Sequence, residues 1–377
     1  MVGNMNKNYK PIALCDTEGM DEAVWLKLRA HGPHFDDPSH PDYIKYGVGG
    51  STVAGIMGLS PWTTPLETWF RLKGEGLAND LPVNEAAKCA GHVWEDFVAK
   101  MIPYMPGYEG TKVINDTTFY QHPEHKFMLA NLDRRVILPD GSEGVGEIKT
   151  TNYRNYETIQ KWKSGIVPAY YELQCRWYMA IMNLPFTLII CAWGFTVNDM
   201  AIIRIERDLK EEKRIINEVK EFLDSIDRDE PPTMDEASNC KLIMSSLDRV
   251  FGAGDPDLPS VDMEGTRRDA IAMEQIKKLL EERKALTSNY NESLNNINSN
   301  IAFWAKNYLA KLGKAEGLRV STPERKYLLT YKTSRRTVVD AEKLKKEKPE
   351  VYDAFKKTTY SRRLSVSECD ESAESVD

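Results

Sequence analysis

The chain has 377 residues, of which 41% are hydrophobic and 28% charged, and its formal net charge is −7. This globular composition excludes collagen-like, disulfide-scaffold and wholly disordered proteins. The longest apolar stretch, within 186–195, is about half of the roughly 20 residues that a membrane helix needs, no apolar signal segment opens the sequence, and the six cysteines lack CxxC spacing. We therefore expect a cytoplasmic protein with reduced thiols and no membrane partner.

The negative charge is unevenly distributed. Residues 365–377 hold five acids and no Lys or Arg, so the rest of the chain has a net charge of −2. Between Arg319 and Arg363, fourteen Lys or Arg accompany six Asp or Glu, which gives a net charge of +8. The overall charge therefore does not exclude a polyanionic substrate, although a basic stretch is also typical of a solvated face.

Three helices are predicted in the first hundred residues. After a polar segment of about 45 residues, two glycines precede a short helix over 51–58. A Thr-Pro pair and a glycine mark the start and the end of a second helix, 64–74. A longer helix spans 85–102, and its Gly91, which costs about 1 kcal/mol relative to Ala, indicates that something approaches the backbone closely there.

The middle of the chain has mainly β signals. Two strand-like segments flank a Pro-Asp-Gly turn that is typical of a hairpin, and a later apolar run indicates a strand buried on both faces. The predicted elements are strand 126–138, turn 139–141, strand 142–151, helix 170–182, strand 186–195, strand 200–206 and helix 208–226. This order predicts an α/β sandwich.

The last third of the chain differs in composition. The Asp-, Pro- and Ser-rich segment 228–262 indicates a connector, and 265–312 predicts a long helix or a helical hairpin. A strand over 327–333 and a basic helix over 341–357 follow. We divide the chain into a core (1–230), a connector (231–262), a mainly helical basic extension (263–364) and an acidic disordered tail (365–377).

The predicted hairpin brings two acids and a lysine together. If the three-residue turn joins its strands, opposed residues have position numbers that sum to 280, which sets Asp133 opposite Glu147. Opposed Cβ atoms lie about 4.5–5.5 Å apart, so both carboxylates can reach one hard cation such as Mg²⁺. Lys149 follows Glu147 by two residues and projects from the same face.

These residues suit the metal-assisted hydrolysis of a phosphodiester. The acids would hold Mg²⁺, which lowers the pKa of a bound water and neutralises charge on the phosphate. The lysine would orient that water or stabilise the transition state. From spacing alone, an ordinary surface hairpin that ends in Glu-Ile-Lys is the alternative.

A longer series of motifs, GGS, GxxxE, LD, ExK and QxxxY, extends the pattern in one order along the chain. In these motifs the chain resembles the YqaJ-like viral recombinase group of the PD-(D/E)XK nucleases, relatives of lambda exonuclease. The matching stretches are WLKLR (25–29), GVGGSTVAGIMGLSPWTTPLETW (47–69), GHVWE (91–95), LANLDRRV (129–136), GVGEIKTT (144–151) and YYELQCRWYMA (170–180). The resemblance implies an α/β, restriction-endonuclease-like core in 1–230, with a central mixed sheet flanked by helices, before the mainly helical C-terminal extension.

The resemblance also implies a metal site. Asp133 and Glu147 would bind Mg²⁺, for which Mn²⁺ would substitute, and the backbone carbonyl of Ile148 would be a third ligand. Lys149 would be the catalytic lysine. Glu95 would direct its carboxylate at the metal, directly or through water, although spacing alone makes it a surface helix acid.

Two polar residues of the predicted helix 170–182 are candidates for the same site. Gln174 and Tyr178 share one face at i, i+4, while the apolar residues of the helix can face the core. By resemblance, Gln174 supports the active site, and we assign Tyr178 to DNA binding. A polar helix face without a role in the site is the alternative.

Ser51 and Thr52 open a helix behind two glycines, which is a geometry that presents backbone N–H groups to an anion. A simple N-cap is equally consistent with the sequence. By resemblance, this region and a preceding arginine, Arg29, would receive the 5′-phosphate of DNA. About twenty residues separate Arg29 from Gly50, more than is usual in the family.

The insertion between these residues is rich in potential metal ligands. They are His31, His34, Asp36, Asp37, His40 and Asp42. A Zn²⁺ site is one interpretation. The prolines at 33, 38 and 41 favour the other, a polar loop without metal.

The resemblance implies a Mg²⁺-dependent DNA exonuclease of the phage recombination type, encoded by a phage or prophage and acting in the bacterial cytoplasm. It would digest double-stranded DNA ends from 5′ to 3′ and leave 3′ single-stranded overhangs. A single-strand annealing protein would be its partner, and a trimeric ring its oligomer. The alternatives are an endonuclease or other DNA-processing nuclease of the same fold, and a non-catalytic module that binds DNA or protein.

Overall fold

The computed structural model describes residues 9–74, 85–233, 240–252, 260, 263–312, 314–323, 325–332 and 340–356. The chain divides into two units, Met1–Gly252 and Ala253–Asp377. We describe each unit separately.

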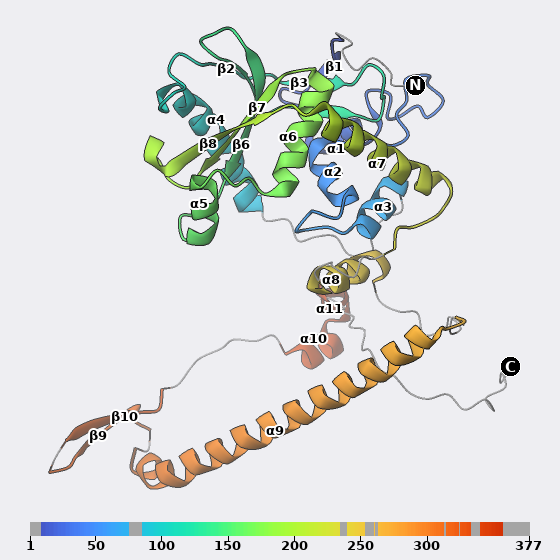
Figure 1. The fold of residues 1–377 in the computed structure, drawn as a ribbon. Coiled ribbons are helices and arrows are strands. Elements are labelled where there is room, and N and C mark those ends of the chain that lie inside the picture. The colour runs from blue at the N-terminus through green and yellow to red at the C-terminus, as the bar shows by residue number, and fades with distance from the viewer. Residues whose placement is uncertain are drawn as a thin grey trace. The chain divides into compact units, whose positions relative to one another are not determined.

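A five-stranded mixed sheet forms the centre of the first unit (Figure 1). Its strands, in spatial order, are β2 (Lys112–Ile114), β5 (Arg134–Ile137), β6 (Glu143–Thr150), β7 (Phe186–Ala192) and β8 (Met200–Glu206). Only the β6–β7 pair is parallel. Every residue of β7 is buried, which explains its continuous apolar sequence, because a central strand needs apolar side chains on both faces.

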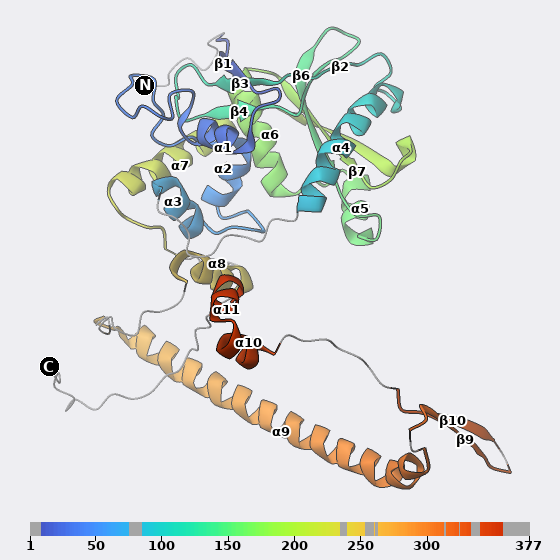
Figure 2. The ribbon, with the colours of Figure 1, turned by 180° about the vertical axis from the view of Figure 1, so that it is seen from behind.

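Helices cover both faces of this sheet (Figures 1 and 2). Along β7, Leu188 and Ile190 pack in one apolar cluster with α4 (Glu85–Met101). The alternate residue Ile189 packs in another cluster with α5 (Tyr156–Lys163) and α6 (Ala169–Met182). Because alternate residues of β7 face opposite sides of the sheet, helices pack on both faces and the core has three layers. The predicted α/β core with a mixed sheet flanked by helices is confirmed.

A second sheet of three antiparallel strands lies beside α6. It consists of β1 (Ile12–Asp16), β3 (Thr118–Gln121) and β4 (Leu129–Asn131). The prediction of one strand over 126–138 was wrong, because the chain leaves β4 and enters β5 of the central sheet after only two residues. At this crossing Leu132 is buried and Asp133 leaves the ladder.

Helix caps define the N-terminal helices α1 (Glu22–His31), α2 (Gly50–Ile56) and α3 (Pro65–Lys73). Thr64 caps α3 by accepting from the N–H of Glu67, and Gly74 ends it in the left-handed region at φ 83°, as the sequence predicts. In α2 the N-cap is Gly49, so the N-cap interpretation of Ser51 was wrong. The remaining elements of the first unit are 3₁₀ turns at Ile102–Tyr104 and Val197–Asp199, α7 (Leu209–Asp227) and α8 (Cys240–Phe251).

Helix α8 lies within the segment predicted as a connector and packs on α3 through a buried ion pair. Nη2 of Arg249 lies 2.7 Å from Oε2 of Glu67, and its Nε donates to Oε1 at 3.1 Å. Burial by itself raises the pKa of Glu67, but the guanidinium of Arg249 outweighs burial and holds that pKa below its ordinary value. The sequence analysis missed this contact for two reasons. Glu67 and Arg249 are far apart in the sequence, and the segment that holds Arg249 has the Asp- and Ser-rich composition of a connector.

Arg249→Ala is expected to destabilise the protein by about 3 kcal/mol at neutral pH, because the buried Glu67 carboxylate then keeps, among the described residues, a single ion pair, with the exposed Arg71 at 3.2 Å. The native pair stabilises the fold above the ordinary pKa of Glu67 and loses that effect as the pH falls through the lowered pKa. Urea unfolding at neutral and acidic pH measures both trends. Arg228→Ala, at an exposed ion pair, should cost less than about 1 kcal/mol; equal losses would contradict the prediction.

The second unit contains a 46-residue helix, α9 (Arg267–Leu312). Of the two predicted alternatives, the single long helix is therefore correct and the helical hairpin is wrong. A hairpin follows, β9 (Gly317–Ser321) and β10 (Lys326–Thr330), whose first strand the sequence analysis missed. The predicted helix 341–357 is two helices, α10 (Ala341–Glu347) and α11 (Pro349–Phe355). They separate at Lys348 because proline disfavours the helical conformation at the residue before it, and Pro349 follows Lys348.

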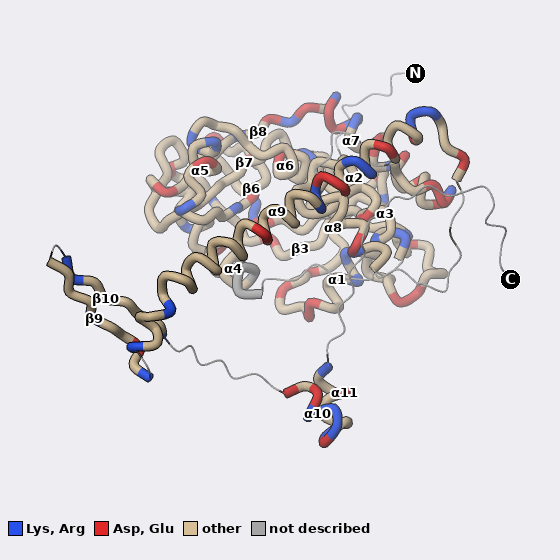
Figure 3. Tube along the Cα trace, turned by 90° about the horizontal axis from the view of Figure 1, so that it is seen from below, with Lys and Arg blue, Asp and Glu red and all other residues tan. Residues whose placement is uncertain are grey.

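Figure 3 shows Lys and Arg on β9, β10 and α10, and acids on the two short helices α10 and α11. The tail 365–377 lies outside the described residues. Among the helices that the structure describes, none combines the length and apolar character that crossing a membrane requires.

Candidate active site

The β5–β6 hairpin has the register that the sequence predicts. Arg134 pairs with Gly146 and Ile137 with Glu143, so paired numbers sum to 280, and Gly141 closes the turn at φ 85°. Asp133, just before β5, accepts a hydrogen bond through Oδ2 from the backbone N–H of Ile148 at 2.8 Å. The hairpin therefore brings Asp133 next to the Glu147–Ile148 end of β6.

Glu147 is fully buried. Its Oε1 accepts a hydrogen bond from Nζ of Lys149, whereas its Oε2 has no hydrogen-bond partner in the described structure. Burial raises the pKa of Glu147, and the carboxylate of Asp133 raises it further, although Lys149 opposes both. Two carboxylates and an unsatisfied oxygen form a hard-oxygen donor set, which fits a divalent cation such as Mg²⁺.

Lys149 lies between the acids and an aromatic ring. Its Nζ is 4.9 Å from the centre of the Tyr171 ring, and its side chain is 18% exposed. Burial by itself lowers the pKa of Lys149, but Glu147 and Asp133 outweigh burial and keep it above the ordinary value. The lysine is therefore a positive charge next to the two acids, accessible from one side.

Glu95 comes from α4, and Arg134 determines its position. Nη1 of Arg134 lies 2.5 Å from Oε1 of Glu95, and Nη2 is paired with Asp96. Nη1 also donates to Asn115 at 3.3 Å. The sequence analysis missed Arg134; the available signal was the Arg-Arg pair in a predicted strand, since one of two adjacent strand residues must face inward.

Gln174 and Tyr178 lie on the same face of α6, as predicted. Nε2 of Gln174 donates to the hydroxyl of Tyr178 at 3.2 Å, and Tyr178 is buried. This face packs against the start of α2 at Gly50, where an added Cβ would lie 2.8 Å from both Gln174 and Tyr178. Only glycine permits this approach without displacing them.

Gly50→Ala is therefore expected to destabilise the first unit by about 1–3 kcal/mol through overpacking. Gly91→Ala is the matched helix substitution. An added Cβ at Gly91 meets nothing within 4 Å, so the predicted close approach at Gly91 was wrong. Removing this glycine should stabilise α4 by roughly 0.5–1 kcal/mol. Thermal unfolding of both variants measures the difference, and effects of the same sign would contradict it.

Arg29 reaches α2 in spite of the insertion. The inserted loop closes at its base, where the N–H of Gly47 donates to the carbonyl of Ala30 at 2.7 Å. Nη2 of Arg29 donates to the hydroxyl of Ser51, and its guanidinium lies 5.2 Å from the Trp25 ring. No ion pair between Arg29 and a carboxylate occurs within the part of the chain that the structure describes. The positive charge of Arg29 is therefore available to pair with a phosphate.

Two adjoining cavities are lined by predicted site residues. One, of 380 Å³, is lined by Glu95 and Asp133, and the other, of 680 Å³, by Thr52 and Lys149. Both cavities are lined by Arg29, Ser51 and Gln174. The structure thus places the predicted site side chains, apart from that of the fully buried Glu147, in the lining of two cavities that share three residues. The role of the Ile148 carbonyl as a ligand stays a prediction.

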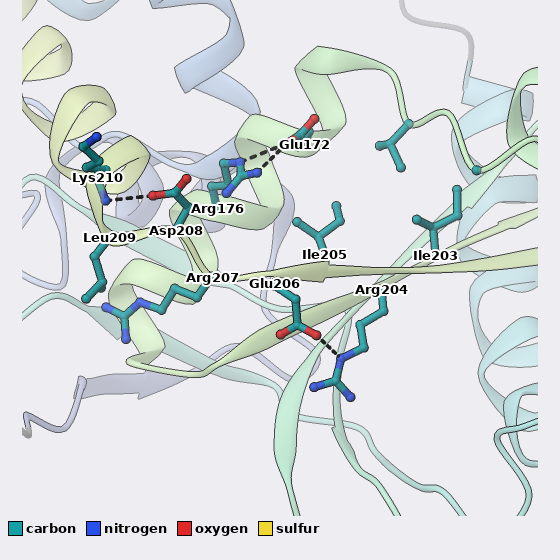
Figure 4. Close-up of a pocket in the computed structure, with 12 residues that line it drawn as sticks. Glu172, Arg176, Ile203, Arg204, Ile205, Glu206, Arg207, Asp208, Leu209 and Lys210 are labelled. Carbon is teal, nitrogen blue, oxygen red and sulfur yellow. Dashed lines mark hydrogen bonds and ion pairs between the residues drawn. The ribbon is translucent and has the colours of Figure 1, made fainter.

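A separate cavity of 770 Å³ lies between β8 and the start of α7 (Figure 4). Within its lining, Arg176 pairs with Glu172 and Arg204 with Glu206. None of the predicted site residues lines it. The cavity therefore lacks the Asp133–Glu147–Lys149 cluster, and we do not assign the active site to it.

The mixed sheet, its flanking helices and the Asp-Glu-Lys cluster at the β5–β6 hairpin have the arrangement of a PD-(D/E)XK-type core. Residues 24–185 match the family model described as YqaJ-like viral recombinase domain. The uncharacterized protein YqaJ of Bacillus subtilis (strain 168) is 26% identical over 327 residues, which cover 85% of this chain and 91% of that protein. The resemblance seen in the motifs is thus confirmed over residues 24–185, which match this family model.

Solved structures are more distant. The crystal structure of LHK-Exo in complex with dAMP is 22% identical, with a TM-score of 0.39. The crystal structure of the alkaline exonuclease LHK-Exo from Laribacter hongkongensis is 20% identical, with a TM-score of 0.38. Each comparison covers 48% of this chain and 89% of the other.

Proposed function

We propose that the protein is a Mg²⁺-dependent DNA exonuclease that degrades one strand of linear duplex DNA from the 5′ end. The observation that carries the proposal is the convergence of Asp133, Glu147 and Lys149 beside two cavities. The products would carry 3′ single-stranded overhangs suited to single-strand annealing. The match to a viral recombinase domain supports this role.

The residues present fit a divalent cation held by Asp133 and Glu147. When bound, the ion would lower the pKa of a water and neutralise charge on the scissile phosphate. Lys149 would donate a hydrogen bond to the attacking water or to a phosphate oxygen, because its Nζ is charged and already close to Glu147. Glu95, held by Arg134, would orient a further water at the same place.

The anion-binding residues would hold the end of the DNA strand. The guanidinium of Arg29 and the hydroxyl of Ser51 face both cavities, so a terminal phosphate between them would receive charge-assisted hydrogen bonds. Thr52 would contribute from the same helix turn. Tyr178 and Gln174 would bind or position DNA beside this phosphate.

Digestion of end-labelled linear duplex tests the proposal. Mononucleotide release from the 5′ end, dependent on Mg²⁺ or Mn²⁺ and faster with a 5′-phosphate than with a 5′-hydroxyl, is expected. A covalently closed circular plasmid should remain intact. Cleavage of the circle would instead indicate an endonuclease, and absence of cleavage of any substrate, with DNA binding retained, would indicate a non-catalytic module.

We further propose that the protein acts in the bacterial cytoplasm beside a single-strand annealing protein and forms a trimeric ring. A ring would hold the duplex topologically and make digestion processive. Sedimentation equilibrium of the full chain, and co-purification with a candidate annealing protein, would test the two assemblies separately. The basic residues between 319 and 363 would contact the phosphate backbone and make binding sensitive to salt.

A further inference from the structure

The loop between α1 and α2 gathers metal-ligating side chains apart from the Asp133–Glu147 pair. His34, His40 and Asp42 each offer one ligand atom, and these atoms lie within 4.8 Å of one another. We propose that this loop binds a Zn²⁺ ion through these three side chains. Two imidazoles and a carboxylate are donors that zinc commonly takes, at about 2.0–2.2 Å each.

The backbone of the loop brings the ligands together. Three successive turns are closed by hydrogen bonds from Asp37 to the carbonyl of His34, from His40 to that of Asp37, and from Tyr43 to that of His40, each 3.0 Å long. Each such turn brings its first and fourth residues close together. The turns therefore fold residues 34, 37 and 40 back toward one another, and the prolines at 33, 38 and 41 restrict the φ angles of the loop.

The two histidines are unusually close. Their rings stack with centroids 3.4 Å apart and planes 14° apart. This stacking brings one ring nitrogen of each histidine close to the Asp42 carboxylate. His31 does not belong to this group, because its Nδ1 lies 3.1 Å from the carbonyl of Ile44 and 3.2 Å from the hydroxyl of Tyr43.

The acids of the loop supply negative charge. Asp42 accepts an ion pair from Nζ of Lys126 through Oδ1 at 3.0 Å, which leaves its other oxygen for a metal. Asp37 uses Oδ1 to accept hydrogen bonds from Ser39, and both histidines act on it electrostatically. Asp37 does not belong to the group whose ligand atoms converge, so a water molecule would complete the coordination.

An ion at this site would hold the loop whose ends carry Arg29 and the start of α2. Its role would be structural, since its ligands are distinct from the residues around the DNA-binding cavities. The proposed Zn²⁺ site can therefore be tested independently of the proposed nuclease activity.

The test uses the full chain, stripped of metal with a chelator and carrying Asp133→Asn so that the acidic site takes up little metal. Zn²⁺ is titrated with excess Mg²⁺ present, and Co²⁺ is used as a spectroscopic probe of the ligand field. One equivalent of Zn²⁺ should bind. His34→Ala and His40→Ala should each weaken affinity by at least about 100-fold, since even outer partners of a ligand contribute 10–100-fold.

Two further variants sharpen the result. Asp36→Asn, at an exposed acid of the same loop, should leave Zn²⁺ affinity unchanged. Lys126→Ala should increase it, because the ammonium competes with the ion for Asp42. Equal Zn²⁺ uptake and equal Co²⁺ spectra in the parent, His34→Ala and His40→Ala proteins, each shown to be folded by circular dichroism, would overturn the proposal.

Discussion

Lys149→Ala should lower the rate of DNA cleavage by about 10³-fold or more while DNA binding is retained. The ammonium group lies beside Glu147 and opens into a cavity that Arg29 and Ser51 also line. A charge-stabilising donor in such a site typically contributes 10²–10³-fold to the rate, and here the same group is also the candidate to orient the water. Binding depends on other cations, so it should change little.

Single-turnover digestion of labelled duplex measures the rate, and fluorescence anisotropy with Ca²⁺ in place of Mg²⁺ measures binding. Lys161→Ala provides the control, because that lysine is 57% exposed and pairs only with a neighbour on its own helix. Cleavage at the normal rate by Lys149→Ala would place the catalytic centre elsewhere in the chain.

Asp133→Asn should abolish both cleavage and the stabilisation of the protein by divalent metal. An asparagine can still accept the hydrogen bond from the N–H of Ile148, so the hairpin should fold. One of the two carboxylate ligands is lost, however. At a free Mg²⁺ concentration of 100 times Kd, the parent protein gains about 2.7 kcal/mol of stability, and this gain should vanish in the variant.

Thermal unfolding with and without Mg²⁺ or Mn²⁺ measures this effect. Asp140→Asn, in the exposed turn of the same hairpin, should retain the full metal-dependent shift. A shift in Asp133→Asn equal to that of the parent would exclude this aspartate as a ligand.

The pH dependence of metal binding follows from Glu147. Its raised pKa in the metal-free fold means that the carboxyl is protonated over a wider range than an exposed glutamate. The neutral form stabilises the metal-free protein at low pH, and this stability is lost as the pH rises through the raised pKa. Mg²⁺ affinity should therefore rise with pH, which isothermal titration across pH 6–9, roughly the range around such a shifted carboxyl, can measure.

Local patterns were sufficient to predict the pairing of the β5–β6 hairpin and several helix ends. A three-residue turn determines which residues face each other, so the approach of Asp133 to Glu147 followed from numbering alone. Thr64 and Gly74 bound α3 for reasons confined to a single turn of helix. Likewise, the four-residue spacing of Gln174 and Tyr178 sufficed to put them on one face.

Contacts between distant segments could not be read in this way. The pairing of Arg249 with Glu67, the inward position of Arg134 and the contact of Arg29 with Ser51 across an insertion all depend on how separate elements pack. The same holds for the break between β4 and β5, where the chain moves from one sheet to another. Sequence spacing describes neighbours within a few residues, whereas burial and charge pairing arise only when the packed layers exclude water. That is why the grouping of Asp133, Glu147 and Lys149 could be predicted from the sequence, whereas the cavities beside them could be found only in the folded structure.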